Sequence, residues 1–445
     1  MLKSSHTARL RIPRFSMQLP RELGNGGPYF AMVLINALGY GLFAPFSILY
    51  FHLVVGLSLP LVGLGLTVAT GVGLVATPLS GPLIDRLGAR FVAVMTNLLR
   101  AVCLAAYLIV HSFAGFLIVA LLLAAGNNSA GAAGTALVVD LAAPEDRDRW
   151  YALNRMAFNA GAGAGALLAG ILVAVGGTAG YRWVAGLNGL SFALAAGLLL
   201  LVRVHRATVA TEAGRGTYRT VLRDRPFLGL VGANTILWIS VVAQEVALPP
   251  YLILVVHAPA WIVGLLFGLN TGMVVVLQMP VMRVVNSWQR TRNIAASGLG
   301  YGLSFLLFAV APFVATGLLP IYLCTCMILY TLAEIIYGPT SSALAAAIAP
   351  IGMQGRYLAI FQLSLASAAT VTPALAGSLL ATSPQGLWLL LALLMVGAAA
   401  LIVLLERGLP QAALRTAKGA TTTSVQQRAG DLECSKPCAC KSGLS

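Results

Sequence analysis

Residues 81–90 read GPLIDRLGAR and form a short polar segment between two long apolar stretches. Asp85, Arg86 and Arg90 lie in this segment, although only 9% of the whole chain is charged and 59% of it is hydrophobic. An ordinary soluble domain is about 25% charged. The composition therefore excludes a soluble globular protein and indicates apolar segments joined by short polar connections.

Twelve apolar stretches are long enough to cross a membrane as helices. A helix rises about 1.5 Å per residue, so about 20 apolar residues span a hydrocarbon core of about 30 Å. The stretches do not alternate apolar and polar residues as barrel strands do. The predicted fold is an all-α integral membrane protein. Its predicted spans are residues 28–51, 60–80, 90–110, 114–141, 149–175, 183–203, 226–253, 260–282, 293–313, 318–346, 356–381 and 386–405.

The 28 Lys and Arg residues gather on one side of these spans. All but Arg100 and Arg182 lie in the two tails or in the even-numbered connections and their flanks. Such a bias marks the cytoplasmic side of a membrane protein, so both termini are expected in the cytoplasm. The net charge of +15 is then explained by topology, and nucleic acid is not an expected partner.

The two tails are not expected to add a further domain. Residues 1–27 form a basic N-terminal tail, and residues 406–445 form a polar tail that is expected to be disordered. Its CSKPCAC segment contains Cys434, Cys438 and Cys440, one thiol fewer than a structural zinc site requires. We therefore expect neither a metal nor another cofactor.

The chain contains an internal repeat. Ala166 and Gly170 align with Pro373 and Gly377 at a constant offset, and further matches surround both pairs. Parallel repeats of this kind are a transporter architecture with the substrate site between the halves. The predicted organisation is a bundle of six helices over 28–203, a basic cytoplasmic linker over 204–225 and a second bundle of six over 226–405.

With these features in place, the chain resembles the major facilitator superfamily, in particular its bacterial proton-coupled drug and metabolite exporters. Gly81, Asp85, Arg86, Gly88 and Arg90 match the family's signature loop between the second and third helices, while Ala89 replaces one basic residue. The resemblance implies two six-helix bundles related by a pseudo-twofold axis, which expose a central site to each side in turn. It also implies that the acidic residue of the loop latches the outward-facing state. A solvated loop aspartate is the alternative.

The fifth span contains GAGAGALLAG, which is similar to a glycine pattern found in antiporters of the family. Gly161, Gly165 and Gly170 fit that pattern, whereas Ala166 and Ala169 depart from it. Small residues at this spacing also allow close helix packing in lipid, so packing alone is an equal alternative.

Three ionisable residues are predicted to lie well inside spans: Arg100, Glu245 and Glu334. Each would be costly if it faced lipid, so each is a candidate for the proton-coupling site or the cavity. A carboxyl group whose exposure to water changes can gain and lose a proton, which is what proton coupling requires. The alternatives are a structural, hydrogen-bonded Glu334, a Glu245 at the headgroup boundary and a purely structural Arg100.

Neutral polar residues in the spans are weaker candidates for the cavity lining. The fourth span carries AAGNNSAGAAG where many drug antiporters of the family carry an arginine, so their proton relay cannot be transferred in detail. The predicted polar cavity residues are Asn36, Asn127, Asn128, Gln244 and Gln278.

Together these features predict a secondary transporter that works by alternating access, with proton-driven efflux of small apolar or amphipathic molecules as the leading hypothesis. A proton-coupled symporter and a narrow-specificity metabolite exporter are the alternatives within transport, followed by a membrane sensor or scaffold. No HExxH, GxSxG or Walker sequence occurs, so an enzyme is not expected. The expected partners are a small-molecule substrate, protons and the lipids of a bacterial plasma membrane, with the protein as a monomer.

Overall fold

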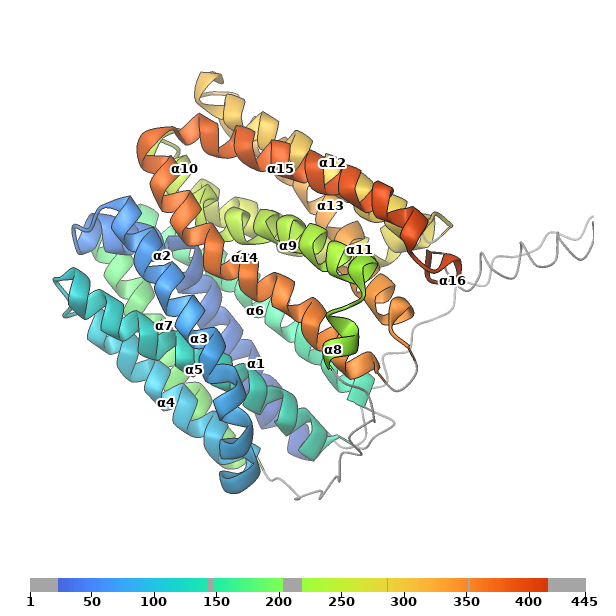
Figure 1. Cartoon of the computed structure of the whole chain (residues 1–445). Coiled ribbons are helices and arrows are strands. Elements are labelled where there is room, and N and C mark those ends of the chain that lie inside the picture. The colour runs from blue at the N-terminus through green and yellow to red at the C-terminus, as the bar shows by residue number, and fades with distance from the viewer. Residues whose placement is uncertain (1–22, 143–146, 203–217, 286, 351–352, 415–445) are drawn as a thin grey trace, which may run out of the picture.

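The computed structural model describes residues 23–414, except 143–146, 203–217, 286 and 351–352. All regular structure in these residues is helical, and eleven helices are long and apolar enough to cross a membrane. The predicted second span corresponds to one further helix of 29 residues. The long helices are α1 (Leu23–Phe43), α3 (Leu59–Leu87), α4 (Ala89–Tyr107), α5 (Phe113–Leu141), α6 (Arg147–Gly176), α7 (Thr178–Leu201), α9 (Arg225–Val246), α11 (Ala260–Val285), α12 (Arg290–Val310), α13 (Leu319–Ile348), α14 (Gln354–Thr382) and α15 (Pro384–Leu405). The expectation of a twelve-helix membrane protein is confirmed (Figure 1).

The first and seventh spans are broken near one end of the molecule. The first was predicted as one span, but α1 ends at Phe43 and is followed by the short elements η1 (Ala44–Phe46), α2 (Ser47–Leu49) and η2 (Tyr50–Val54). The seventh divides at Ala247 into α9 and α10 (Leu248–Leu254). Proline lacks a backbone N–H and its ring clashes with the preceding turn, so Pro249 accounts for the second break. Pro45, at the start of η1, accounts for the first.

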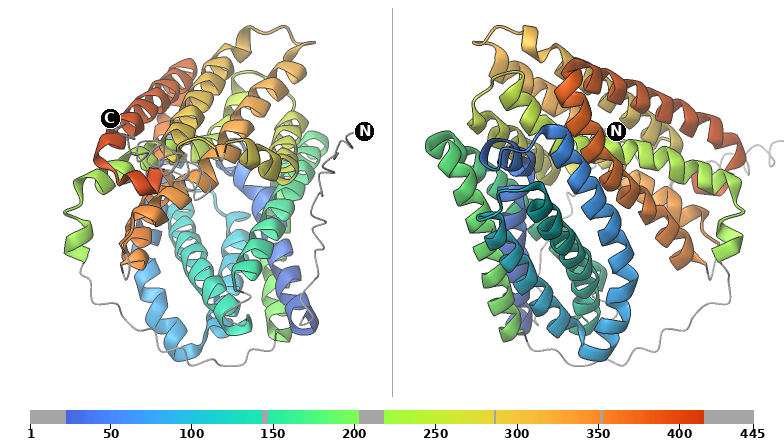
Figure 2. Two further views of the ribbon diagram at one scale, coloured as in Figure 1. Left: turned by 90° about the vertical axis from the view of Figure 1, so that its right-hand side faces the viewer. Right: turned by 60° about the vertical axis from the view of Figure 1, so that its left-hand side comes forward.

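The helices form two sets of six. In the N-terminal half, α1 packs on α6 and α7, while α4 packs on α5 and α7. In the C-terminal half, α12 packs on α13 and α15, and α9 packs on α14 and α15. The halves meet along α3 with α14 and along α6 with α11. Figure 2 shows the first of these contacts, with α14 in orange beside α3 in blue.

Glycines bring the two halves into backbone contact at both crossings. A Cβ added at Gly63 of α3 would lie 2.3 Å from the carbonyl oxygen of Pro373 in α14. At the second crossing, a Cβ on Gly170 of α6 would lie 2.9 Å from the Cα of Gly264 in α11. The sequence repeat aligns Gly170 with Gly377, which itself lies against Gly63. The two crossings are therefore equivalent parts of the repeat.

The halves contact each other toward one end of the bundle. We call the end with Gly88, Leu201 and Arg225 the basic end, and the end with Gly177 and Ser383 the opposite end. Contacts between the halves join residues 59–71 of α3 to residues 369–377 of α14, and residues 163–170 of α6 to residues 260–271 of α11. These stretches lie in the parts of the helices nearer the opposite end. There η1 and α2 also contact α10. Figure 1 shows α8 (Tyr218–Val221) and α16 (Gln411–Leu414) at the other end. The protein is thus closed at the opposite end.

Candidate functional site

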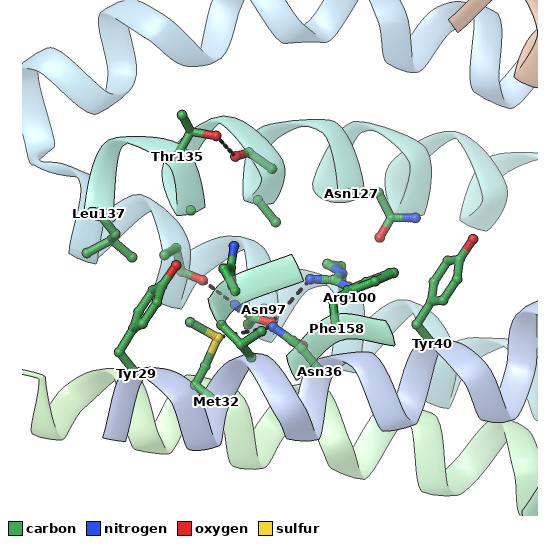
Figure 3. A pocket seen from close by; sticks show the side chains of 16 residues that line it. Tyr29, Met32, Asn36, Tyr40, Asn97, Arg100, Asn127, Thr135, Leu137 and Phe158 are labelled. Carbon is green, nitrogen blue, oxygen red and sulfur yellow. Dashed lines mark hydrogen bonds between the residues drawn. The ribbon is translucent and has the colours of Figure 1, made fainter. Parts of the chain in front are cut away.

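A cavity of about 260 Å³ lies among α1, α4, α5 and α6, and we call it the N-half cavity. Its walls include the apolar side chains of Met32, Val33, Leu137 and Phe158. Its polar lining residues are Tyr29, Asn36, Tyr40, Asn97, Arg100, Asn127, Thr135 and Asn154. Figure 3 shows Asn36, Asn97 and Arg100 close together, with Asn127 and Tyr40 beside them. The cavity therefore combines one cation with several amides and an apolar wall.

Arg100 is buried in the middle of α4 and is only 8% exposed. Its Nη1 donates to the Oδ1 of Asn97 at 3.3 Å, and its guanidinium carbon lies 3.6 Å from the centre of the Phe192 ring. Its Nε has no acceptor among the residues that the structure describes. The amide of Asn97 is itself fixed, because its Nδ2 donates to the carbonyl of Ala93 at 2.8 Å. Arg100 and Glu334 line different cavities.

A second cavity, of about 100 Å³, lies between the halves, and we call it the interhalf cavity. α6 contributes Arg155 and Asn159, while Asn270, Gln278 and Glu334 come from the C-terminal half. Arg155 and Glu334 thus face one space from opposite halves. A carboxylate and a guanidinium in this arrangement attract one another as long as the carboxyl group is ionised.

Glu334 is half-buried and is held by a neighbouring helix. The Nδ2 of Asn270 in α11 donates to its Oε2 at 2.7 Å and lies 3.1 Å from the Oγ1 of Thr331. The Thr331 hydroxyl donates to the carbonyl of Met327 in its own helix. The amide of Asn270 therefore orients the carboxyl group, and that group remains open to the interhalf cavity.

Glu245 lies at the closed end of the molecule and forms a direct connection between the halves. The hydroxyl of Tyr40 in α1 donates to its Oε1, although the two residues are 205 positions apart in the chain. Glu245 comes one residue before the last residue of α9, next to the break at Ala247. Tyr40 also lines the N-half cavity, so one side chain contacts both the cavity and the closure between the halves.

The five neutral polar candidates have different locations. Asn36 and Asn127 line the N-half cavity, and Gln278 lines the interhalf cavity. Gln244 is buried, and its Nε2 has no partner among the described residues. Asn128 lies in neither of these two cavities: its Nδ2 donates to the carbonyl of Ala124 and occupies the space beside Gly73 of α3. The cavity role of Asn128 stays a prediction, and its Nδ2 lies on the face of α5 that packs on α3.

The segment 81–90 spans the end of α3 and the beginning of α4. Gly88 joins the two helices with φ of 89°, a backbone conformation that favours glycine. The Nε of Arg90 donates at 3.0 Å to the carbonyl of Leu199 near the end of α7, so this arginine has a structural role in addition to its place in the charge pattern. Asp85 and Arg86 are exposed, and Asp85 has no hydrogen bond or ion pair with any described residue.

The small residues of the fifth span pack against two different partners. A Cβ on Gly161 would lie 2.6 Å from the carbonyl oxygen of Leu34, and one on Gly165 would lie 2.1 Å from that of Leu38. Both contacts join α6 to α1 within the N-terminal half. Gly170, one and a half turns further on, contacts α11 of the other half. The stretch is thus a packing surface on two faces of α6.

Sequence reasoning missed several residues of these sites, among them Tyr40, Arg155 and Asn270. Arg155 was counted among the basic residues that flank the fourth connection. Its place inside the predicted span 149–175 was a usable signal, because a charge within a span needs a reason. Tyr40 and Asn270 carried no comparable signal.

No group of three or more His, Cys, Asp or Glu side chains in the described residues could hold a metal ion. The thiols of Cys103, Cys324 and Cys326 are free. Of the tail that was expected to be disordered, residues 406–414 form η5 (Glu406–Gly408) and α16. Residues 415–445, with Cys434, Cys438 and Cys440, lie outside the described residues, as do residues 1–22 and most of the predicted linker.

Comparison with known proteins adds three findings. The profile of the Major Facilitator Superfamily matches residues 29–350. The multidrug resistance protein MdtH of Cronobacter sakazakii is 29% identical over 76% of this chain and 83% of its own length. MdtH of Yersinia enterocolitica is 27% identical over 79% and 86%.

Among solved structures, a mutant form of the nucleoside transporter NupG superposes with a TM-score of 0.72. It is 12% identical and covers 85% of this chain and 98% of its own. A POT family transporter in complex with a thioalcohol-conjugated peptide gives a TM-score of 0.67 at 14% identity, covering 86% and 96%. At these identities the likeness concerns the fold.

Proposed function

Because this chain belongs to the major facilitator superfamily, a family of membrane transporters, we propose that it is a proton-driven exporter of small apolar or amphipathic molecules. Proteins named for multidrug resistance are its relatives at 27–29% identity over three quarters of the chain, which supports export of foreign molecules. The apolar walls of the N-half cavity are suited to amphipathic cargo.

The observation that carries the proposal is Glu334 in the interhalf cavity, opposite Arg155 of the other half. When Glu334 is ionised, it attracts Arg155 and accepts the hydrogen bond from Asn270. When it is protonated, the attraction between the halves is lost at this point. Uptake and release of a proton therefore change the relative stability of the two arrangements of the halves, which is the requirement for coupling.

Glu245 is proposed as the second proton-coupling residue, at the closed end. Separation of the halves there requires the hydrogen bond from Tyr40 to break, which exposes the Glu245 carboxyl group to water. When Glu245 binds a proton in the open state, its ionised carboxylate is lost. The hydrogen bond from Tyr40 to that carboxylate then cannot form again until the proton leaves. The two acids would thus respond to opposite sides of the membrane.

The orientation in the membrane is part of the proposal. The positive-inside rule supports a cytoplasmic position for the basic end, where Arg86, Arg90 and Arg225 lie. With that orientation the structure corresponds to a cytoplasm-facing state, closed on the outside by Tyr40 and Glu245. In this state an exposed Asp85 is compatible with a latch that closes only in the outward-facing state. We propose that the protein acts as a monomer in the bacterial plasma membrane, with both termini in the cytoplasm.

The proposal is tested in inverted membrane vesicles that are acidified inside. For an exporter, the addition of a transported, uncharged apolar dye such as Nile red should release protons from the vesicle interior. We expect Glu334→Gln to abolish this dye-evoked release. The matched control is Glu406→Gln. The Glu406 carboxyl group follows the end of α15, accepts a hydrogen bond from the Thr291 hydroxyl and lies outside both cavities. Full proton release with Glu334→Gln would contradict the assignment of Glu334, and dye movement together with protons would indicate a symporter instead.

A further inference from the structure

Arg100 is an uncompensated buried charge. An ionised group that is removed from water is costly unless it is paired with an opposite charge or with several hydrogen bonds. Arg100 is 8% exposed, yet its described polar contact is one long hydrogen bond to Asn97, and its Nε has no acceptor among the described residues. The contact with the Phe192 ring stabilises one face of the guanidinium but uses none of its N–H donors.

The missing partner is not supplied by the walls of the N-half cavity. Its described lining contains no acidic side chain. Besides Arg100, its polar groups are amides and the hydroxyls of two tyrosines and Thr135, and the Oδ1 atoms of Asn36 and Asn154 are also buried without a partner in the described part of the chain. A buried cation and two unpaired amide oxygens thus border one cavity of about 260 Å³.

We propose that the N-half cavity is a binding site for an amphipathic organic carboxylate, with its carboxylate on the guanidinium of Arg100. A guanidinium presents paired N–H donors that match the two oxygens of a carboxylate. The amides of Asn36 and Asn154 bind polar groups next to the carboxylate, and Met32 and Phe158 contact the apolar part. This inference rests on the proposed transport function and specifies its substrate class.

The arrangement also sets the charge of the ligand. Arg100 is the only cation in the described lining of the N-half cavity, and the guanidinium of Arg155 lies in the interhalf cavity opposite Glu334. One cation neutralises a single negative charge, which favours a monocarboxylate over a phosphate ester. Lipophilic cations are disfavoured in this cavity because they would face the Arg100 charge without a counter-ion.

The test uses the full-length protein in detergent and a matched pair of probes. 1-Naphthylacetate carries the carboxylate, and 1-naphthylacetamide has almost the same shape without the charge. We expect calorimetry at neutral pH to show that the acid binds about 10- to 100-fold more tightly than the amide, as for a hydrogen bond to a charged group. Arg100→Gln should reduce this ratio to about one, Arg100→Lys should retain part of it, and Arg292→Gln, an exposed arginine on α12, should leave it unchanged.

A second variant displaces Arg100 without removing its charge. A Cβ on Gly126 would lie 3.1 Å from the Cγ of Arg100, so Gly126→Ala should shift the guanidinium and weaken binding of the acid more than binding of the amide. Equal affinity of the wild-type protein for the two probes, or an unchanged preference in Arg100→Gln, would overturn the inference. The inference would also be overturned if binding of chloride required Arg100 and binding of the two probes did not. Because these measurements need no proton gradient, a preference for the acid without dye-evoked proton release would reject only the export mechanism, and the reverse result would reject only the carboxylate site.

Discussion

Substitution of Gly63 by alanine should push the two halves apart at the crossing of α3 and α14. The added Cβ would lie 2.3 Å from the carbonyl oxygen of Pro373, whereas ordinary contacts begin near 3.4 Å. The helices must therefore separate locally by about 1.1 Å, the difference between these distances. The clashing atom belongs to the backbone, so no side chain can rotate away. Overpacking of this kind costs about 1–3 kcal/mol.

The repeat supplies a graded series for this prediction. Gly264→Ala at the equivalent crossing of α6 and α11 would place its Cβ 3.0 Å from the carbonyl oxygen of Ala166, which requires a shift of only a few tenths of an ångström. Gly232→Ala in α9 meets nothing within 4 Å and serves as the control. The expected loss of stability is therefore largest for Gly63→Ala, smaller for Gly264→Ala and absent for Gly232→Ala.

The assay is the midpoint of thermal unfolding of the purified protein, followed by tryptophan fluorescence and checked by size-exclusion chromatography. A midpoint for Gly63→Ala as high as that of Gly232→Ala would show that the halves are not in backbone contact at Gly63. A larger loss of stability for Gly264→Ala than for Gly63→Ala would show that α6 and α11 are packed more closely than α3 and α14. Either result would refute the reasoning.

Three further substitutions test other contacts. Tyr40→Phe removes the hydrogen bond to the ionised Glu245 and should shift the equilibrium toward opening by about 10- to 150-fold, measured as an increased proton leak in substrate-free proteoliposomes. Asp85→Asn should insert normally into the membrane but reduce dye-driven proton release at least about tenfold if this residue latches the outward-facing state; full activity would mean a merely solvated side chain. Arg90→Gln removes donors to the carbonyl end of α7 and should lower thermal stability by about 1–3 kcal/mol, whereas Arg86→Gln, at an exposed position, should not.

The helices were predictable because a membrane imposes a minimum apolar length. The predicted spans 60–80 and 386–405 correspond to α3 and α15, with α3 extended by about two turns into the polar segment. The break after Phe43 was not predicted, because one proline near the end of an apolar run does not distinguish a kink from the end of the helix.

The sites were harder to predict because their geometry depends on residues that are distant in the chain. Glu245 could be found as a charge inside a span, but its pairing with Tyr40 depends on how the two halves meet. Arg155 was assigned to topology because a count of basic residues does not show which way a side chain points. The cavity role of Asn128 stays a prediction, because its side chain donates within α5 and lies beside α3.

The double role of Tyr40 separates two kinds of ligand. Its hydroxyl closes the halves onto Glu245, and the same residue lines the N-half cavity. By reciprocity, a ligand that weakens this closure by some factor must itself be bound more weakly, by the same factor, whenever the closure is intact. A molecule that disturbs the Tyr40 hydroxyl therefore promotes its own passage. A molecule that fills the cavity and leaves this hydroxyl in place is bound equally well whether or not the closure is intact, so it does not promote opening, and the expected effect of a tight binder of this kind is inhibition.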